Sequence, residues 1–250
     1  MKALITGASS GIGRDMARLL SNMGYDLILV ARRKDRLEEL KKELNTNVEI
    51  ISLDISSTFN CMKLYNKVKK EDIDILINNA GFGTFGKFTD IKLDNELDMI
   101  DLNIKTVHTL TKLFLKDFKK KDKGYILNVA SSAAFFPGPL MATYYATKAY
   151  ILRLTLAINE ELRRDDSYVY VGALCPGPVN TEFNEVADVI FTLKGLSSEY
   201  VAKYAIEKMF KKKTIIIPSV KMKTLIYLSK ILPLKTQAKV SYNIQKRKNS

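Results

Sequence analysis

The segment Thr6-Gly7-Ala8-Ser9-Ser10-Gly11-Ile12-Gly13 decides the fold of this chain. It follows an apolar run at 2–6, which is typical of a buried strand, and it leads into a helical pattern at 11–23. Three glycines between a strand and a helix allow a tight turn, and the start of the helix offers unpaired N–H groups to an anion. A glycine-rich connection can also be purely structural. Its place after the first strand predicts a dinucleotide-binding turn.

The same alternation of apolar runs and helical patterns continues along the chain. Strands are predicted at 2–6, 26–31, 48–54, 73–78, 124–130, 168–175 and 214–218. Helices are predicted at 11–23, 34–44, 57–70, 93–120, 143–162 and 198–210. Several strands are nearly continuous apolar runs, as in parallel strands covered on both faces. The order predicts an α/β fold: a doubly wound parallel sheet of seven strands in a Rossmann-like three-layer αβα arrangement.

The length and composition fit one globular domain. The chain has 250 residues, of which 46% are hydrophobic and 27% are charged. No internal repeat, low-complexity run or Pro/Ser linker precedes residue 218. We therefore expect a cofactor-binding unit at 1–218, which includes a substrate loop at 179–197, and a basic amphipathic extension of the same domain at 219–250.

The net charge of +13 comes from the C-terminal end of the chain. No Asp or Glu follows Glu207, whereas 12 of the 40 Lys and Arg residues do. The first 207 residues therefore carry 28 basic and 27 acidic groups and are nearly neutral. This distribution argues against a protein whose main surface is a groove for nucleic acid.

Scarce residue types exclude several chemistries. His108 is the only histidine, so we expect no histidine-rich metal site, and no nucleophile-elbow pattern accompanies it. Cys61 and Cys175 form no CxxC pair and suit a reducing compartment. The first residues enter a strand directly, and no apolar run reaches roughly 18 residues. We expect a cytoplasmic protein without a secretory signal or a spanning helix.

The end of the second predicted strand bears on the cofactor. A site for NAD usually has an acid about 20 residues after the glycine turn, where it bonds the ribose 2′-OH. This chain has Arg32 and Arg33 there instead. A guanidinium suits a 2′-phosphate, so the pair predicts NADP(H) over NAD(H), although both could simply start a solvated helix. Asp54, followed by Ile55, is placed to bond the adenine amino group or to cap the helix near Ser57.

Tyr144 and Lys148 are the first candidates for catalysis. They are four residues apart on a predicted helix, so their side chains share one face. A phenol alone titrates near pH ~10, and a neighbouring ammonium lowers that pKa. Such a pair suits proton transfer to and from a carbonyl/alcohol couple, although the spacing alone is common. Tyr145 is the competing tyrosine, but the residue four positions after it is Ala149.

Two serines follow the fifth predicted strand. The segment Asn128-Val129-Ala130-Ser131-Ser132 ends at the sheet edge where open α/β sheets bind ligands. A serine hydroxyl there can donate to a carbonyl oxygen on which charge develops. Alternatively, Ser132 caps a turn.

These residues together resemble the short-chain dehydrogenase/reductase family, in its Tyr-x-x-x-Lys branch of about 250 residues. The resemblance reaches to about residue 218. It includes Asn78-Asn79-Ala80-Gly81 after the fourth strand and Cys175-Pro176-Gly177-Pro178-Val179-Asn180-Thr181 after the sixth. Each motif is weak alone, but all of them occur in order and at the proper spacing.

The resemblance implies a role for each matching residue. Tyr144 would be the general acid in reduction and the general base in oxidation. Lys148 would hold the nicotinamide ribose and lower the tyrosine pKa. Ser131 matches the family's serine, and Asn103 matches an asparagine that orders a water in a proton relay, unless it only belongs to a solvated helix face. The implied cofactor contacts are Gly7, Ser9, Ser10, Gly11, Ile12, Gly13, Arg32, Arg33, Asp54, Ile55, Asn79, Ala80, Gly81, Tyr144, Lys148, Pro176, Gly177, Val179 and Thr181.

The implied reaction is the reversible, NADPH-dependent reduction of a carbonyl to an alcohol. The candidate substrate contacts are apolar, which favours an apolar or acyl-type ketone, although they could be ordinary core. They are Phe82, Phe85, Phe135, Phe136, Met141 and Phe183, with Val186, Ile190 and Phe191 in the following segment. The alternative is an NAD(P)-binding regulatory protein with this fold and little activity. The family's habit implies a homodimer or homotetramer.

The stretch 221–240 departs from the family pattern. It mixes apolar residues with lysines, and Pro233 would break a helix there. One interpretation is a basic amphipathic segment on an anionic membrane surface. A second is a cover over the substrate pocket, or a segment that attracts an acidic carrier such as a coenzyme A ester or an acyl carrier protein. A third is a helix packed on the body or on a partner subunit, with a disordered end at 246–250.

Overall fold

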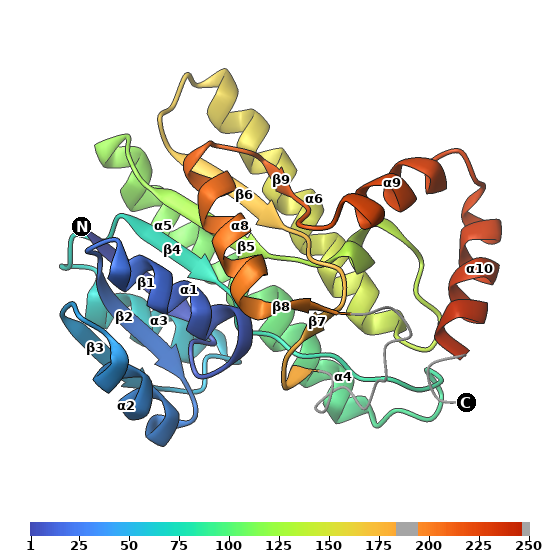
Figure 1. The fold of residues 1–250 in the computed structure, drawn as a ribbon, viewed down its shortest axis with the longest axis horizontal. Helices are drawn as coiled ribbons and strands as arrows, with labels where there is room; N and C mark the ends of the chain where they lie inside the picture. Colours follow the sequence, from blue (N-terminus) through green and yellow to red (C-terminus); the bar gives the residue numbers. More distant parts are fainter. Residues whose placement is uncertain (184–194, 247–250) are drawn as a thin grey trace.

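A parallel sheet forms the centre of the molecule (Figure 1). The computed structural model describes residues 1–183 and 195–246. Its main sheet has seven strands in the order β3-β2-β1-β4-β5-β6-β9. They are β1 (Lys2–Thr6), β2 (Asp26–Ala31), β3 (Val48–Ser52), β4 (Ile75–Asn78), β5 (Tyr125–Val129), β6 (Tyr170–Leu174) and β9 (Ile215–Ile216). The predicted doubly wound α/β fold is confirmed.

Helices cover both faces of the sheet. The first face carries α1 (Gly11–Asn22), α2 (Lys34–Glu43) and α8 (Ser198–Phe210), and the second carries α3 (Thr58–Val68), α5 (Val107–Lys121) and α6 (Ala142–Arg164). Strand β1 shows why both layers are needed. Ile5 packs into the first layer and Leu4 into the second, and both are fully buried. Alternate side chains of a parallel strand thus supply two cores.

The strand order reverses between β1 and β4. The chain builds β2 and β3 on one side of β1, and β4, β5, β6 and β9 on the other. Thr6 joins the ends of the two central strands, because its hydroxyl donates to Ile77 O (3.3 Å) and accepts from Asn79 N (3.0 Å) and Ala80 N (3.1 Å). Ligands bind at such a reversal point, outside the carboxyl ends of the strands.

One predicted helix differs from the structure. The stretch 93–120 forms α4 (Leu93–Ile100), a π-helical turn η1 (Asp101–Thr106) and α5. The wider turn buries Asn103 and Thr106, and the Thr106 hydroxyl donates to Ile55 O. Insertions of this kind occur often at functional sites. The other predicted helices and the strands of the main sheet agree with the structure to within two residues at each end.

Smaller elements complete the described chain. A 3₁₀ turn, η2 (Ser132–Phe135), follows β5, and β7 (Val179–Asn180) pairs with β8 (Leu196–Ser197). The described part of the chain ends in α9 (Val220–Ser229) and α10 (Leu234–Lys246), with Pro233 between them as predicted. These two helices, residues 219–246, are the C-terminal helix pair, and Figure 1 shows them on the side of the molecule opposite β3.

Three contacts hold the C-terminal helix pair in place. Ile226 of α9 is buried in the cluster that contains Ile217. The Gln237 amide of α10 donates to Ser229 O (3.0 Å) and Leu232 O (2.9 Å), which satisfies carbonyls at the end of α9. The Gln245 amide donates to the hydroxyl of Tyr145 on α6. The inner side of the pair therefore contacts the body.

Candidate active site

A cavity of about 580 Å³ follows the carboxyl ends of the central strands. It extends from the glycine turn after β1 to the C-terminal helix pair. Most of the predicted cofactor contacts line it: Gly7, Ser9, Ser10, Gly11, Ile12, Arg32, Arg33, Asp54, Ile55, Asn79, Ala80, Gly81, Tyr144, Lys148, Pro176, Gly177, Val179 and Thr181. Gly13 and Asn103 lie behind this lining.

The turn after β1 requires its glycines. Gly7 (φ +65°) and Gly11 (φ +53°) adopt left-handed conformations, which side chains disfavour. A Cβ on Gly13 would lie 2.4 Å from Asn79 Nδ2 and 2.5 Å from Gly7 O. The Asn79 amide donates to Thr6 O (3.1 Å) and Gly7 O (3.0 Å), so the turn is held against β4. Among the described residues, no side chain caps α1 at its N-cap residue, Ser10. The first N–H groups of α1 fit a pyrophosphate.

Arg33 lies across the serines of this turn. Its guanidinium donates to Ser9 Oγ (3.1 Å), to Ser10 Oγ (3.0 Å) and to Glu182 Oε2 (2.8 Å). Arg36 also donates to Glu182, and the hydrogen bonds from Arg33 and Arg36 lower the pKa of that carboxyl. Two hydroxyls and a guanidinium gathered at one point fit a phosphate group.

Glu182 is a site residue that the sequence analysis missed. It lines the cavity directly after the Pro176–Thr181 segment, but only the tertiary structure brings it to Arg33, 149 positions away in the chain. Arg32 also lines the cavity, with an exposed side chain.

Asp54 faces the cavity and does not cap the following helix. Its carboxylate accepts from Ser56 N (3.0 Å), whereas the cap of α3 is Ser57, whose hydroxyl accepts from Asn60 N (3.2 Å). The capping alternative for Asp54 is therefore wrong. Asp54 and Ile55 both line the cavity next to β3.

Tyr144, Lys148 and Ser131 meet in the middle of the cavity. Tyr144 and Lys148 lie on the first turns of α6 and are buried, with the lysine Nζ 5.8 Å from the centre of the tyrosine ring. Lys148 donates to Val129 O (2.9 Å), at the end of β5. Ser131 follows β5 and lines the cavity together with Tyr144 and Lys148. The residues predicted from spacing are thus assembled at one place.

The pKa of Tyr144 is dominated by burial. Burial raises it to about 12, although the Ser131 hydroxyl acts in the opposite direction. Burial lowers the pKa of Lys148 to about 8. Lys148 is not among the groups that set this pKa, and its ammonium bonds a backbone carbonyl, so the expected lowering of the tyrosine pKa by Lys148 stays a prediction. The phenol therefore carries its proton at neutral pH.

Ser131, and not Ser132, caps a turn. The Ser131 hydroxyl accepts from Ala133 N (3.1 Å) at the start of η2. The backbone of Ser132 donates to Pro176 O (2.8 Å), which joins this loop to the segment after β6. A hydroxyl can accept one bond and donate another, so Ser131 remains able to donate toward the cavity.

Asn103 is fully buried in the π-helical turn. Its amide donates to Phe82 O (2.9 Å) and Thr147 Oγ1 (3.1 Å), and its carbonyl accepts from Phe82 N (3.1 Å). The solvated-face alternative is therefore wrong. A Cβ on Gly81 would lie 2.8 Å from Asn103 Oδ1 and 3.4 Å from Lys148 Nζ, so only glycine fits between them. The water relay through Asn103 stays a prediction.

Apolar side chains line one end of the cavity. Four of the candidate substrate contacts are among them: Phe82, Phe136, Met141 and Phe183. The structure places Phe85 and Phe135 elsewhere: both are partly buried and pack into two hydrophobic clusters beside the cavity. Val186, Ile190 and Phe191 lie outside the described residues.

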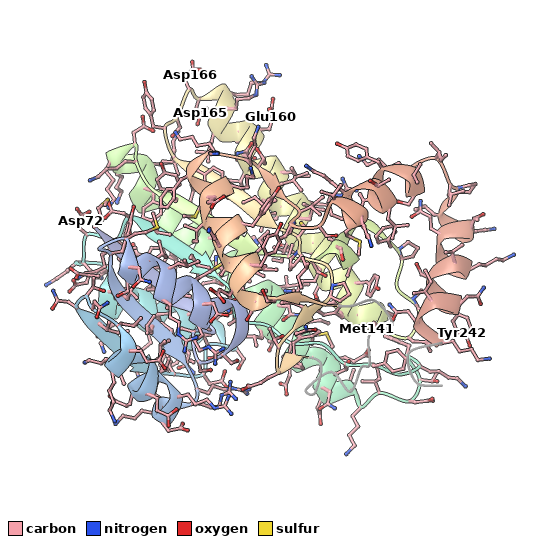
Figure 2. All side chains as sticks on the ribbon, in the orientation of Figure 1. Asp72, Met141, Glu160, Asp165, Asp166 and Tyr242 are labelled. Carbon is pink, nitrogen blue, oxygen red and sulfur yellow. The ribbon has the colours of Figure 1, made fainter. Side chains whose placement is uncertain are left out.

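The C-terminal helix pair forms the far wall of this end. Its lining residues are Met222, Leu225, Leu228, Ser229, Leu232, Gln237, Val240, Ser241, Ile244 and Gln245. In Figure 2, Met141 lies on the side of the body toward α10, the helix that carries Tyr242. Of the interpretations left open for this stretch, the cover over the pocket matches this geometry, and so does packing on the body.

Known proteins share these features. Residues 1–188 match the family model described as short chain dehydrogenase. An uncharacterized oxidoreductase of Staphylococcus epidermidis is 38% identical over 189 residues, which cover 74% of this chain and 81% of that protein. The NADP-dependent 3-hydroxy acid dehydrogenase of Schizosaccharomyces pombe is 37% identical over 192 residues, which cover 73% of each chain.

A solved structure has the same fold. The short-chain dehydrogenase from Sphingobium yanoikuyae in complex with NADPH is 30% identical, with a TM-score of 0.82 over 92% of this chain and 93% of that chain. The sequence match spans the glycine turn, the serine and the Tyr-x-x-x-Lys pair, all of which line one cavity here. The chain therefore belongs to the short-chain dehydrogenase/reductase family and is an NAD(P)-dependent oxidoreductase.

Proposed function

We propose that this protein catalyses the reversible reduction of an apolar ketone to an alcohol with NADPH. The observation that carries the proposal is one continuous cavity. It has a glycine turn and a phosphate-sized cluster at one end, an apolar wall at the other, and Tyr144, Ser131 and Lys148 between them. A dinucleotide and a carbonyl substrate can therefore meet at a buried proton donor.

The proposed preference for NADP(H) rests on Arg33 and its partners. The guanidinium and the hydroxyls of Ser9 and Ser10 would hold the 2′-phosphate, with Arg32 beside them. Glu182 would have to release Arg33 or share it with the phosphate.

Other lining residues would hold the rest of the cofactor. The turn N–H groups would receive the pyrophosphate, and Asp54 and Ile55 the adenine. Asn79, Ala80 and Gly81 would flank the adenosine ribose. Lys148 would bind the nicotinamide ribose, and Pro176, Gly177, Val179 and Thr181 would contact the nicotinamide and its phosphates. The close approach of Gly13 to Asn79 and Gly7 O leaves no room for a side chain in this cradle.

The chain's own residues supply the proton and the polarisation. When bound, NADPH provides the hydride that the carbonyl carbon receives. Tyr144 gives its phenolic proton to the carbonyl oxygen, which balances the hydride and completes the alcohol. Ser131 donates a hydrogen bond to the same oxygen and stabilises the charge that develops there. In the reverse direction Tyr144 receives the proton. Asn103 would order the water through which Lys148 restores it.

The cavity wall supports an apolar or acyl-type substrate. Phe82, Phe136, Met141 and Phe183 face leucines and a methionine of the C-terminal helix pair across the same cavity. Phe85 and Phe135 would act from behind this wall by supporting Met141 and Phe136. The related fission yeast enzyme is named for 3-hydroxy acids, which is compatible with an acyl-type ketone.

A substrate screen tests the proposal. Purified protein is mixed with NADPH and a panel of alkyl, aryl and 3-oxoacyl ketones, and the absorbance of NADPH is followed. Tyr144→Phe should abolish turnover and keep NADPH affinity, because it removes only the phenolic oxygen. Tyr150→Phe is the matched control on the same helix, since Tyr150 bonds His108 (2.8 Å) away from the cavity. Full turnover by Tyr144→Phe would refute the mechanism.

The same screen addresses the alternative of a regulatory protein. That alternative predicts tight NADPH binding and no turnover of any ketone or alcohol by the wild type. We also propose a cytoplasmic homodimer or homotetramer, on the family's habit alone. Sedimentation velocity of the purified chain tests the oligomer, and a monomer at micromolar concentration would contradict it.

A further inference from the structure

The outer side of the C-terminal helix pair exposes large apolar side chains. Ile231 is 81% exposed and Leu234 is 73% exposed, and both flank Pro233 at the turn between α9 and α10. Val220, Tyr227 and Tyr242 are also exposed, whereas the exposed Leu225, Leu228, Leu232, Val240 and Ile244 line the cavity. Scattered apolar residues are normal on a surface, but several large apolar side chains exposed at one turn indicate a contact surface.

All charged residues of the same helix pair are basic. Between 219 and 246 there are six lysines and no acid: Lys221, Lys223, Lys230, Lys235, Lys239 and Lys246. Among the described residues, none of these six takes part in an ion pair. Lys230 lies over the ring of Tyr227 at 5.1 Å, so apolar and cationic groups are interleaved. Six of the 13 excess positive charges of the chain therefore lie on this helix pair.

We propose that the outer face of the C-terminal helix pair docks on an anionic lipid bilayer. Ile231 and Leu234 would enter the boundary between headgroups and acyl chains, and the lysines would meet the anionic headgroups. Lysine stems are long enough to lie along apolar surface while the ammonium stays at the phosphate level. Every helix within residues 1–183 and 195–246 is too short or too polar to cross a bilayer, so the contact is peripheral.

Charge decides between a bilayer and a second copy of this chain. A symmetric contact through this face would bring six lysines against the same six lysines, with no acid in the segment to separate them. An acidic protein would satisfy the charges. It would also need a pocket for the apolar turn, whereas a bilayer accepts a protruding apolar turn of any shape. The combination of a basic surface and an apolar tip therefore favours lipid.

The docking face and the cavity share residues. Leu225, Leu228 and Leu232 line the cavity, yet they are 45%, 60% and 40% exposed. The apolar end of the cavity therefore reaches the surface on the helix pair itself. If the proposed function holds, this continuity indicates that the substrate is a lipid-soluble ketone. Such a ketone would pass from the bilayer to Tyr144 without crossing bulk water.

Vesicle sedimentation of the full-length chain tests docking. The probes are vesicles of phosphatidylcholine alone and of phosphatidylcholine with phosphatidylglycerol. Wild type should sediment only with the anionic vesicles, and less so at high salt. The double variant Ile231→Glu/Leu234→Glu should lower the bound fraction at least about tenfold. Phe59→Glu is the matched control, since Phe59 is 76% exposed on α3 in the body.

Several results would overturn the proposal. Docking is refuted if wild type stays in the supernatant with anionic vesicles, and equally if the double variant and Phe59→Glu sediment alike. If the double variant breaks an oligomer in lipid-free buffer, the face is a subunit interface. If an acidic carrier protein binds the face while vesicles do not, that partner replaces the bilayer. NADPH affinity and turnover of a water-soluble ketone in lipid-free buffer are measured in parallel, so that a failed reaction is distinguished from failed docking.

Discussion

Replacing Arg33 by alanine tests how this protein selects its cofactor. In the structure the guanidinium joins two serines of the glycine turn to Glu182. Alanine removes the cation that would face a 2′-phosphate, and it leaves the carboxylate of Glu182 near the same place. The affinity for NADPH should fall, whereas the affinity for NADH, which has a hydroxyl there, should change little.

The expected size of the effect follows from the exposure of Arg33. Hydrogen bonds to a charged group contribute about 1.5–3 kcal/mol, or roughly 10- to 150-fold in Kd. The Arg33 side chain is 41% exposed, so solvent screening favours the lower end of that range. We therefore expect the Kd of NADPH to rise roughly tenfold, with less than about a threefold change for NADH.

Titration calorimetry with both cofactors measures the two affinities. Arg36→Ala is the matched control, because Arg36 bonds Glu182 but no serine of the turn. Glu182→Gln should act in the opposite direction and tighten NADPH binding several-fold, since it removes the anion that competes for Arg33. An equal loss of affinity for NADPH and NADH in Arg33→Ala would show that Arg33 only supports the turn.

Three further predictions concern packing and charge. Gly81→Ala should lower both kcat and the melting temperature, at a cost of about 1–3 kcal/mol, because its Cβ would lie 2.8 Å from Asn103 Oδ1; unchanged thermal melting would contradict this. Lys148→Met should inactivate the protein yet stabilise the fold by up to about 3 kcal/mol at pH 7, because burial lowers the lysine pKa from 10.5 to about 8. The unfolded chain binds the extra proton between those pH values, so the advantage of methionine should shrink as pH rises from 8 to 10.5 in urea titrations, and a constant difference would argue against a buried ammonium. Phe118→Ala should destabilise by about 3–5 kcal/mol and Phe59→Ala by under about 0.5, since these side chains are 1% and 76% exposed; equal urea midpoints would refute the core assignment.

Local patterns were sufficient for the sheet and for the assembly of the central site. The apolar strands and the turn at Thr6–Gly13 predict the β1–α1 unit, because buried parallel strands and left-handed glycines leave direct traces in a sequence. The spacing of Tyr144 and Lys148 also holds, since residues four apart on a helix share a face regardless of the rest of the fold.

Other properties of the site depend on residues that are distant in the chain. Burial, which several elements create together, raises the resting pKa of Tyr144, and no local pattern indicates it. Glu182 reaches Arg33 across 149 positions, and no local pattern marks that pairing. Phe85 and Phe135 have the same character as Phe82, yet only the packed structure decides which phenylalanine lines the cavity.

The C-terminal end shows most clearly which properties follow from the local sequence and which follow from the tertiary structure. The sequence by itself determined that the excess charge lies after Glu207 and that a helix must stop at Pro233, since composition and the proline ring act locally. Only the tertiary structure decided that α9 and α10 close the far wall of the cavity, held by Gln237 and Gln245. Side-chain contacts between distant segments depend on how the layers pack, and that packing is a property of the whole chain.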